Sequence, residues 1–398
     1  MAAALPPSGA VRAFVPEVRD EQVADLRARL ALTRWPEEAT EPGAAQGPAL
    51  ADVQRLVGHW RDGYDWAAFA GRIASVPQLK VDIDGLGVHA MHVRSRRSDA
   101  IPLLLTHGWP STCYEFLRLL PLLAEPAQGL AFHVVAPSLP GYGWSDRPSE
   151  PGWGIERTAD AWAALMDRLG YPRFVAHGGD WGAVVSTTLA RRHPERVRGL
   201  HLTLPMSAAT DDDRATASPR EQRGLIREAA YRRDGSAYAQ LQRTRPQTIG
   251  YALVDSPVGL CAWIAEKMWA WSDTAPDGGS LLSDDDVLDA VSVYWLSATG
   301  ASAARLYREV DWRAQQAPVD VPTGCSIFPA EIIRPPRTAV ERQYRRLCHW
   351  RELERGGHFP AAEVPELLAA EIRELAEQLH RLESSPVNGQ SNPCEGPR

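Results

Sequence analysis

Asp180 is the residue whose surroundings most clearly predict chemistry. It lies in the turn His177–Gly182 (HGGDWG), between an apolar, strand-like run, Arg173–Ala176, and a helix-like run, Ala183–Arg192. Such a strand-to-helix turn pushes the central side chain out of the sheet, and the next amide, that of Trp181, points at the group under attack. We therefore expect a carboxylate nucleophile with one oxyanion donor beside it.

A carboxylate in this position favours alkylation over acyl transfer. Attack on a carbonyl would give a labile anhydride, whereas attack on an sp3 carbon gives an ester that water can cleave. Epoxides and haloalkanes are the obvious substrates. The alternative is structural, because an aspartate after a strand also caps ordinary helices. The chain contains no Gly-x-Ser-x-Gly turn, which leaves a serine esterase without a candidate nucleophile.

A second turn could complete the oxyanion hole. Leu103–Thr106 is an apolar run that predicts a buried strand, and it ends in His107–Pro110 (HGWP). This turn can present the amide of Trp109 as a second donor. Its Trp109–Pro110 bond is a candidate for the cis form.

A base and an orienting carboxylate follow later in the chain. His358 lies in the glycine-flexible loop Arg355–Phe359, ahead of an amphipathic helix expected over Pro365–Leu379. Glu331 follows a late strand, Gly324–Phe328, at the place from which it could orient His358. The order Asp, Glu, His is that of the α/β-hydrolase fold.

Segments spread over most of the chain match the motifs of one family. They are Phe14–Pro16, Asp25–Pro36, His107–Pro110, Asp180–Gly182, Arg245–Thr248, Asp255–Leu260 and Arg355–Phe359. Through them the chain resembles the epoxide hydrolases of the microsomal and juvenile-hormone type, within the α/β-hydrolase superfamily. The resemblance implies an α/β-hydrolase fold with a mostly parallel central sheet, a helical cap and an N-terminal meander.

The resemblance also implies which groups activate an epoxide. Tyr238 and Tyr307 stand where the family carries its acid pair, with Tyr251 and Tyr294 as nearby competitors. A phenol can donate a hydrogen bond to the ring oxygen and release its proton as the alkoxide forms.

The expected enzyme is an epoxide hydrolase that works through a covalent aspartyl ester. Asp180 attacks an epoxide carbon, and His358, held by Glu331, deprotonates the water that cleaves the ester to a vicinal diol. The amides of Trp109 and Trp181 hold the oxyanion. No metal, nucleotide or redox cofactor is expected, and the partners are a small-molecule epoxide and water.

Composition and charge exclude some other classes. A net charge of −7 offers no basic footprint for nucleic acid. The cysteines lack the paired spacing of a metal site and are expected to be free thiols; they are Cys113, Cys261, Cys325, Cys348 and Cys394.

Met1–Ala10 has neither a signal-peptide pattern nor a membrane anchor, so we expect a soluble, cytoplasmic enzyme, with a homodimer as one candidate assembly. Lys80 and Lys267 are the only lysines, which associates the chain with a GC-rich bacterial genome.

The chain divides into five expected regions. They are the meander at 1–78, the first part of the core at 79–206, a helical cap at 207–312, the second part of the core at 313–382 and a disordered tail at 383–398. Leu79–Val93 alternates around Asp84–Gly85, a turn sequence that predicts the hairpin at the start of the sheet. Ala208–Ala217 is polar enough to be a linker or an exposed loop.

The expected cap is aromatic enough to line an apolar pocket for a bulky or aryl epoxide. The residues predicted to line it are Trp263, Trp269, Tyr294 and Trp295, with Trp271 in the same run. The alternative is that they are core, since aromatic residues at helical spacing usually pack inside. His107 and His177, which flank the two turns, are expected to be structural hydrogen-bonding groups.

Two other functions remain as alternatives. A haloalkane or haloacid dehalogenase would use the same turn and base but has no need of paired phenols, so Tyr238 and Tyr307 favour an epoxide. A non-catalytic binding protein of this fold would commonly lack the nucleophile or the base, and Asp180, Glu331 and His358 are all present. The substrate stays open between bacterial secondary metabolism, such as enediyne assembly, and detoxification of small styrene-like epoxides.

Overall fold

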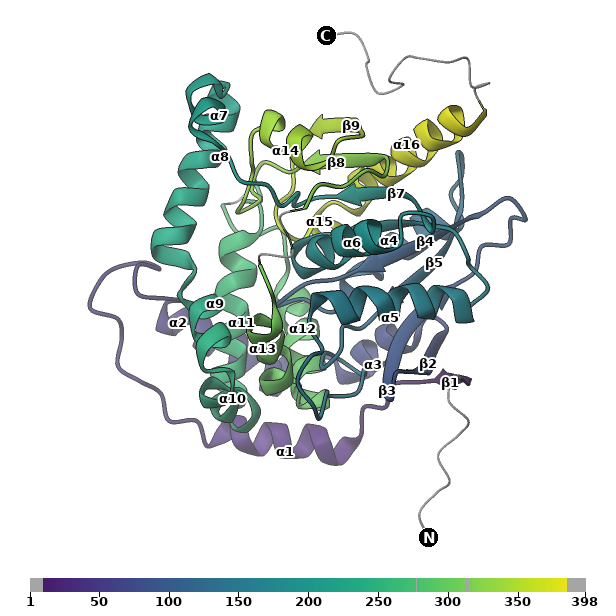
Figure 1. The fold of residues 1–398 in the computed structure, drawn as a ribbon. Coiled ribbons are helices and arrows are strands. Elements are labelled where there is room, and N and C mark those ends of the chain that lie inside the picture. The colour runs from purple at the N-terminus through teal and green to yellow at the C-terminus, as the bar shows by residue number, and fades with distance from the viewer. Residues whose placement is uncertain (1–9, 277, 313–314, 316, 385–398) are drawn as a thin grey trace.

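Nine strands form a single sheet within residues 10–276, 278–312, 315 and 317–384, which the computed structural model describes (Figure 1). Their order across the sheet is β1-β2-β3-β5-β4-β6-β7-β8-β9. The strands are β1 (Val11–Phe14), β2 (Gln78–Ile83), β3 (Leu86–Val93), β4 (Ile101–Thr106), β5 (Phe132–Pro137), β6 (Phe174–Gly178), β7 (Val197–Leu202), β8 (Thr323–Ile327) and β9 (Leu347–Glu352). From β5 to β9 in this order the neighbours are parallel, while β1, β2 and β3 pair antiparallel. The predicted fold class, a mostly parallel sheet of the α/β-hydrolase type, is confirmed.

The central strands are apolar because helices cover both of their faces. Leu104 of β4 pairs with Val135 of β5 on one side and with Ala176 of β6 on the other, and all three are fully buried. Parallel strands that are covered on both faces need continuous apolar runs, and β4 and β6 supply them. Their carboxyl ends therefore reach one edge of the sheet together, where the two sequence turns follow.

The core helices pack in pairs against this sheet. They are α4 (Leu119–Ala124), α5 (Ile155–Arg168), α6 (Asp180–Arg192), α14 (Arg337–Gln343), α15 (Pro360–Glu363) and α16 (Pro365–Ser384), with the short 3-10 helix η2 (Cys113–Phe116) before α4. Helices α5 and α6 contact each other, as do α4 and α16. Helix α16 continues to Ser384, beyond the expected end at Leu379, and Glu383 near its end forms an ion pair with Arg198 at 2.6 Å. The rest of the expected tail lies outside the described residues.

Between β7 and β8 the chain leaves the sheet and forms a group of helices, which we call the cap. Figure 1 shows them on the left, beside the sheet. They are α7 (Asp211–Thr216), α8 (Pro219–Ala230), the π-helical turn η3 (Tyr231–Gly235), α9 (Ala237–Thr244), α10 (Pro246–Asp255), α11 (Pro257–Trp271), α12 (Asp284–Ser297) and α13 (Gly300–Glu309).

The acidic run at the start of the cap differs from its prediction. We expected a linker or an exposed loop over Ala208–Ala217, but α7 begins at Asp211 and Thr210 caps it. Asp213 is buried and forms an ion pair with Arg342 at 2.5 Å. A partner supplied by α14, far along the chain, thus gives the acidic run a fixed helical structure.

The N-terminal segment packs against the cap before it enters the sheet. Its elements are α1 (Asp20–Ala31), α2 (Leu50–Gly58), the π-helical turn η1 (His59–Gly63) and α3 (Trp66–Ala74). Both α1 and α2 contact α11 of the cap. The buried Trp60 indole donates a hydrogen bond to Ser292 Oγ at 2.9 Å, and Asp289 accepts from Tyr64 and from Arg72. These hydrogen bonds hold α12 of the cap against the N-terminal segment.

The hairpin that follows this segment is confirmed. Strands β2 and β3 pair antiparallel, and the turn residues Asp84 and Gly85 both have positive φ, at 55° and 76°. Two consecutive positive φ values are the property of the tight hairpin turn that Asp-Gly sequences favour.

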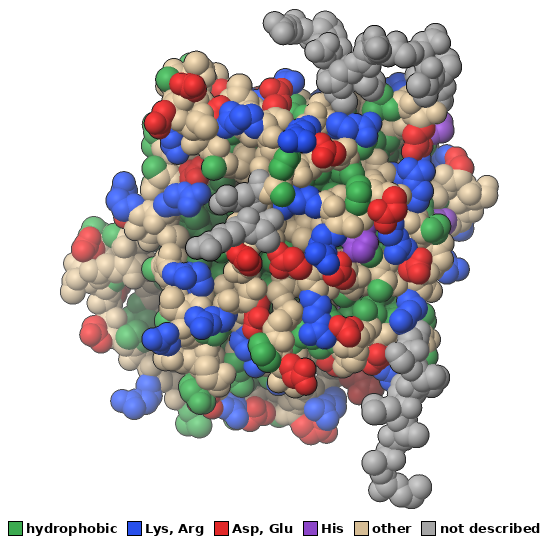
Figure 2. All heavy atoms as spheres, viewed as in Figure 1, with side chains coloured by type: hydrophobic (Ala, Val, Ile, Leu, Met, Phe, Trp, Pro, Cys, Tyr) green, Lys and Arg blue, Asp and Glu red, His purple; other side chains and the backbone are tan. Residues whose placement is uncertain are grey.

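The visible face in Figure 2 carries acidic and basic side chains interspersed with one another. No single helix in the described ranges is long and apolar enough to cross a bilayer, and the two helices that meet this criterion only together, α10 and α11, are bent by 114°.

Replacing Asp289 by alanine is expected to destabilise the fold by about 2 kcal/mol, because Tyr64 and Arg72 lose their shared acceptor in a partly buried place. Urea denaturation monitored by tryptophan fluorescence measures the difference. Asp285→Ala on the same helix is the control, since Asp285 is 53% exposed and its loss should cost under about 1 kcal/mol. Equal losses for the two variants would contradict the fastening role of Asp289.

Candidate active site

Asp180 lies in a strained turn that is possible because several of the residues around it are glycines. It has the left-handed φ of 48° and begins α6 directly after Gly179. A Cβ on Gly182 would lie 1.8 Å from the carbonyl oxygen of Thr106, so the start of α6 packs directly on the end of β4. The turn thereby presents the carboxylate at the carboxyl edge of the sheet, where a nucleophile of this fold stands.

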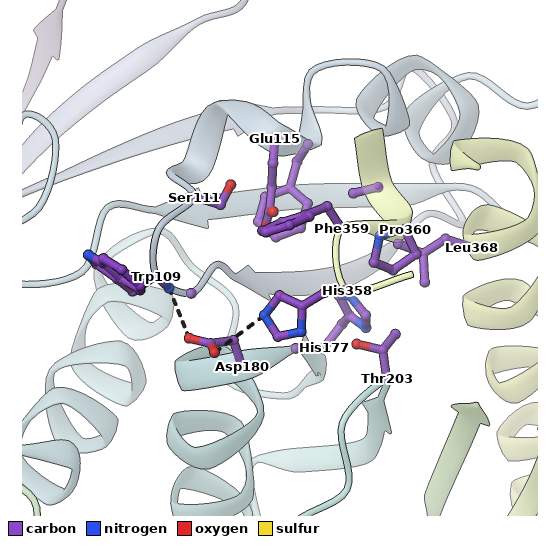
Figure 3. A pocket seen from close by; sticks show the side chains of 14 residues that line it. Trp109, Ser111, Glu115, His177, Asp180, Thr203, His358, Phe359, Pro360 and Leu368 are labelled. Atoms are coloured by element: carbon purple, nitrogen blue, oxygen red, sulfur yellow. Dashed lines mark hydrogen bonds and ion pairs between the residues drawn. The ribbon is translucent and has the colours of Figure 1, made fainter. Parts of the chain in front are cut away.

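The Asp180 carboxylate is held on one oxygen. The backbone N–H of Trp109 donates a hydrogen bond to Asp180 Oδ1 at 2.9 Å, as the dashed line in Figure 3 shows. The Trp109–Pro110 bond is cis, as the sequence suggested. The amide of Trp181 lies in the first turn of α6, where N–H groups lack helical acceptors, and its place as second oxyanion donor stays a prediction.

His358 lies between two carboxylates. Its Nε2 is 3.4 Å from Asp180 Oδ2, and its Nδ1 is 2.7 Å from Oε1 of the fully buried Glu331. The structure therefore brings together the three residues that the sequence placed on separate segments. The arrangement suits a base that a carboxylate orients and that faces a nucleophile.

Backbone contacts fix the loop that carries His358. Gly356 has a φ of 101°, and a Cβ there would lie 2.7 Å from Phe328 and Val364 side-chain atoms. The N–H of Gly356 donates to Asp273 Oδ2 at 2.8 Å, and the N–H of His358 donates to the carbonyl of Trp271 at 3.0 Å. Both acceptors belong to the end of α11 and the loop after it, so the cap holds the histidine loop.

The charges around His358 set its protonation. Burial alone would lower the pKa of His358, but the charge of Glu331 and hydrogen bonds to Asp180 and Glu331 outweigh burial and raise it well above the ordinary value. The imidazole is therefore held as a cation while both carboxylates are ionised. Loss of either negative charge would favour the neutral form.

Tyr238 and Tyr307 reach the same place from the cap. Both line a cavity of about 600 Å³ that also contains Asp180. The ring of Tyr238 stacks on Trp109 at 4.8 Å between centroids, and the ring of Tyr307 meets Trp181 edge-on at 4.7 Å. Burial raises the pKa of both phenols well above the ordinary value, so both stay protonated at neutral pH. Of the competitors, Tyr251 is 71% exposed and Tyr294 is buried.

The sequence did not single out Tyr231, which lines the same cavity. Its hydroxyl lies 3.0 Å from that of Tyr238, within hydrogen-bond distance. No motif marks Tyr231. It is, however, a second tyrosine seven positions before Tyr238, a spacing that two helical turns would bring to one face. The wall of the cavity that contains Asp180 thus carries three phenols, and those of Tyr231 and Tyr238 are within hydrogen-bond distance of each other.

The aromatic wall of the predicted pocket requires a correction. None of Trp263, Trp269, Tyr294 and Trp295 lines either described cavity that contains Asp180. The Tyr294 hydroxyl donates to the carbonyl of Ser111 at 3.1 Å, in the core alternative that the sequence left open. Instead the large cavity is lined by Trp181, Val184, Leu204, Met206, Tyr231, Tyr238, Tyr307, Trp312, Ile332 and Ile333, with Arg232, Ser236, Ala239, Gln240 and Arg243 completing its wall.

Two histidines beside the turns make structural hydrogen bonds. His107 Nε2 accepts from the N–H of Leu139 at 3.1 Å, and His177 Nδ1 lies 2.9 Å from His201 Nδ1. Burial lowers the pKa of His107 to about 4 and of His177 to about 3, so both rings are neutral.

Neither a disulfide nor a cluster of possible metal ligands is found in the described part of the chain. Cys113, Cys261, Cys325 and Cys348 form no disulfide there, and Cys394 lies outside the described residues. Among those residues no group of three or more His, Cys, Asp or Glu side chains could hold a metal ion.

Two family models match the chain. Residues 11–116 match the model described as the epoxide hydrolase N terminus, and residues 101–312 match that of the alpha/beta hydrolase fold. A putative epoxide hydrolase of Stigmatella aurantiaca is 47% identical over 91% of this chain and 84% of its own length. Epoxide hydrolase 1 of Sus scrofa is 33% identical over 92% of this chain and 88% of its own length.

Solved structures give the same result. The juvenile hormone epoxide hydrolase of the silkworm Bombyx mori superposes with a TM-score of 0.88 at 27% identity, covering 95% of this chain and 96% of that one. The Aspergillus niger epoxide hydrolase superposes with a TM-score of 0.84 at 31% identity, covering 94% of this chain and 98% of that one.

Asp180→Asn is expected to lower the pKa of His358, because the substitution removes one of the two negative charges that raise it. NMR titration of the histidine ring resonances measures the change. Asp160→Asn is the matched control, since Asp160 pairs with His193 at the surface and should leave His358 unaffected. An unchanged His358 pKa in Asp180→Asn would show that the Asp180 charge does not act on the imidazole.

Proposed function

The chain belongs to the epoxide hydrolase family of the α/β hydrolases, and we propose that it converts an epoxide to a vicinal diol through a covalent ester on Asp180. One observation carries the proposal. A carboxylate with one oxygen fixed by a backbone amide faces two phenols across an apolar cavity, with a carboxylate-oriented histidine at its side.

The first step uses the carboxylate oxygen of Asp180 that faces His358 and that the Trp109 amide does not hold. Trp109 holds Asp180 Oδ1, so Oδ2 forms the new bond to an epoxide carbon while the bond between that carbon and the ring oxygen breaks. The ring oxygen leaves as an alkoxide and takes a proton from Tyr238 or Tyr307. Because burial keeps both phenols protonated, each can donate a hydrogen bond to the ring oxygen before the bond breaks.

Ester formation changes the state of His358. The ester carries no charge, so one of the causes that raise the pKa of His358 disappears and the imidazolium becomes a stronger acid. Its proton restores the tyrosinate, which leaves a neutral imidazole at the moment when a base is needed. The two carboxylates thus keep His358 protonated in the resting enzyme. Loss of the Asp180 charge in the ester then allows His358 to release that proton.

The second step regenerates the enzyme. Neutral His358 takes a proton from water as the water oxygen bonds to Cγ of Asp180, and Trp109 and Trp181 amides stabilise the oxyanion by roughly 3 kcal/mol each. The bond between Cγ and the alkyl oxygen then breaks, and the alkyl oxygen takes the second proton of the attacking water from the new carboxyl group. Asp180 is left as a carboxylate and His358 as the imidazolium. The sum is one epoxide and one water consumed for one diol.

The large cavity favours a bulky or aryl epoxide. Its volume of about 600 Å³ and its mainly aromatic and aliphatic wall suit a ligand with an extended apolar body. The paired phenols separate this proposal from a dehalogenase, since a departing halide needs no proton. A substrate of this size fits either bacterial secondary metabolism or detoxification.

A single turnover of excess enzyme with styrene oxide in ¹⁸O water tests the ester. We expect unlabelled oxygen in the first diol and ¹⁸O in the peptide that contains Asp180, because water attacks the carboxyl carbon. Mass spectrometry of diol and peptide reads both. Immediate labelling of the diol with an unlabelled Asp180 would replace the ester by direct attack of water on the epoxide.

Tyr238→Phe combined with Tyr307→Phe is expected to lower the rate of ester formation at least about 100-fold, because the alkoxide then leaves without a proton donor. Stopped-flow tryptophan fluorescence under single-turnover conditions measures this rate. Tyr251→Phe is the matched control, since Tyr251 is 71% exposed on the cap. Ester formation at the parent rate in the double variant would remove both phenols from the mechanism.

A further inference from the structure

A second, much smaller cavity lies on the other side of Asp180. Its volume is about 20 Å³, which is room for one water molecule. Asp180 belongs to its wall and to that of the large cavity, whereas the two tyrosines belong only to the large one. An epoxide that enters by the large cavity therefore leaves the small one empty of substrate.

The polar groups around the small cavity suit a water that attacks the ester. They include Ser111, Glu115, His177, Asp180, Thr203 and His358. A buried water is stable where it has two to four polar partners, and this wall provides them. Figure 3 shows Asp180 and His358 below and Ser111 and Glu115 above, with the side chain of Glu115 directed toward the pair.

Glu115 is the acidic residue of η2 that lines the small cavity. It projects from η2, whose start is fixed by Thr112 Oγ1 accepting from the N–H of Tyr114. Burial raises the pKa of Glu115 to about 7, against a hydrogen bond from Ser111 and the charge of His358, which lower it. A carboxyl group in such surroundings is unfavourable for folding unless its oxygens have hydrogen-bond partners.

Glu115 also separates the small cavity from a third one. That cavity, of about 260 Å³, is lined on its far side by Arg72, Arg118, Asp286 and Asp289. Arg118 is 54% exposed and pairs with Asp286 at 2.6 Å, so this cavity adjoins solvent-accessible charged groups. Glu115, Ser111 and Phe359 are shared by both walls, so they form the boundary between the two cavities.

We propose that Glu115 is a positioning residue that holds the hydrolytic water in the small cavity behind Asp180, between His358 and the carboxyl carbon. Its carbonyl oxygen accepts one hydrogen of the water, His358 Nε2 accepts the other, and a lone pair of the water is left facing Cγ of Asp180. The inference rests on the proposed ester mechanism and adds the site and the holder of the second reactant.

The two steps of the reaction separate this role from a structural one. Ester formation uses the large cavity and the phenols, while ester hydrolysis uses the small cavity, so loss of Glu115 should slow only the second step. Misplacement of a reactant by about 1 Å can cost on the order of 100-fold in rate. We therefore expect Glu115→Leu to lower the hydrolysis rate constant on the order of 10- to 100-fold, with ester accumulating.

The test is a pre-steady-state measurement of both rate constants with styrene oxide, and the amplitude of ester formation counts the folded molecules. Glu115→Gln, which retains a carbonyl oxygen, should recover hydrolysis to within about threefold of the parent. Glu125→Leu, at an exposed glutamate that pairs with Arg96, is the control for the type of substitution. Both rate constants of this control should equal those of the parent.

The outcomes distinguish the inference from the function on which it rests. Absence of any ester in the parent enzyme would overturn the proposed mechanism itself. If ester forms in the parent, and Glu115→Leu either hydrolyses it at the parent rate or slows both steps equally, the water-holding role of Glu115 is overturned. A Glu115→Gln variant as slow in hydrolysis as Glu115→Leu would also overturn it.

Discussion

The site depends on one electrostatic arrangement, a single imidazole between two carboxylates in a place largely closed to water. Glu331 is fully buried and the side chain of Asp180 is 18% exposed, and neither charge would be stable there alone. His358 compensates both, at 2.7 Å and 3.4 Å. Since each charge stabilises the next, the three residues must be brought together accurately, and most of the surrounding backbone serves that end.

The positions of these charges come from three unrelated pieces of backbone that share one edge. The ends of β4 and β6 are in register, so the turn with Trp109 lies beside the turn with Asp180, and Gly182 allows the two backbones to touch. The third piece, the loop with His358, follows the parallel strands β8 and β9 at the same edge. A parallel sheet collects loops in this way because all its carboxyl ends lie together.

The parts predictable from sequence were those whose signal is local. A glycine-bounded turn after an apolar strand identified Asp180, and the order of Glu331 and His358 along the chain identified its partners. The orientation of cap helices has no local signal, so Tyr294 was assigned to a pocket although it packs inward. Asp213 was assigned to a loop because its partner, Arg342, comes from another part of the chain. The tyrosine pair was found by resemblance, and Tyr231 and Glu115 carry no motif.

The cap does more than cover Asp180, because it also holds the loop that carries His358. The carbonyl of Trp271 and the carboxylate of Asp273 accept the backbone N–H groups of His358 and Gly356, and the ring of Trp271 lies 5.0 Å from that of His358. Any movement that swings the end of α11 away from the sheet would therefore displace the imidazole as well as the phenols. Opening of the whole cap would therefore separate His358 from its two carboxylate partners. An entry past η3 and Trp312, which line the large cavity, would leave the end of α11 in place. The enclosure of the small cavity then follows from the same constraint, since the loop that positions His358 also forms part of its wall.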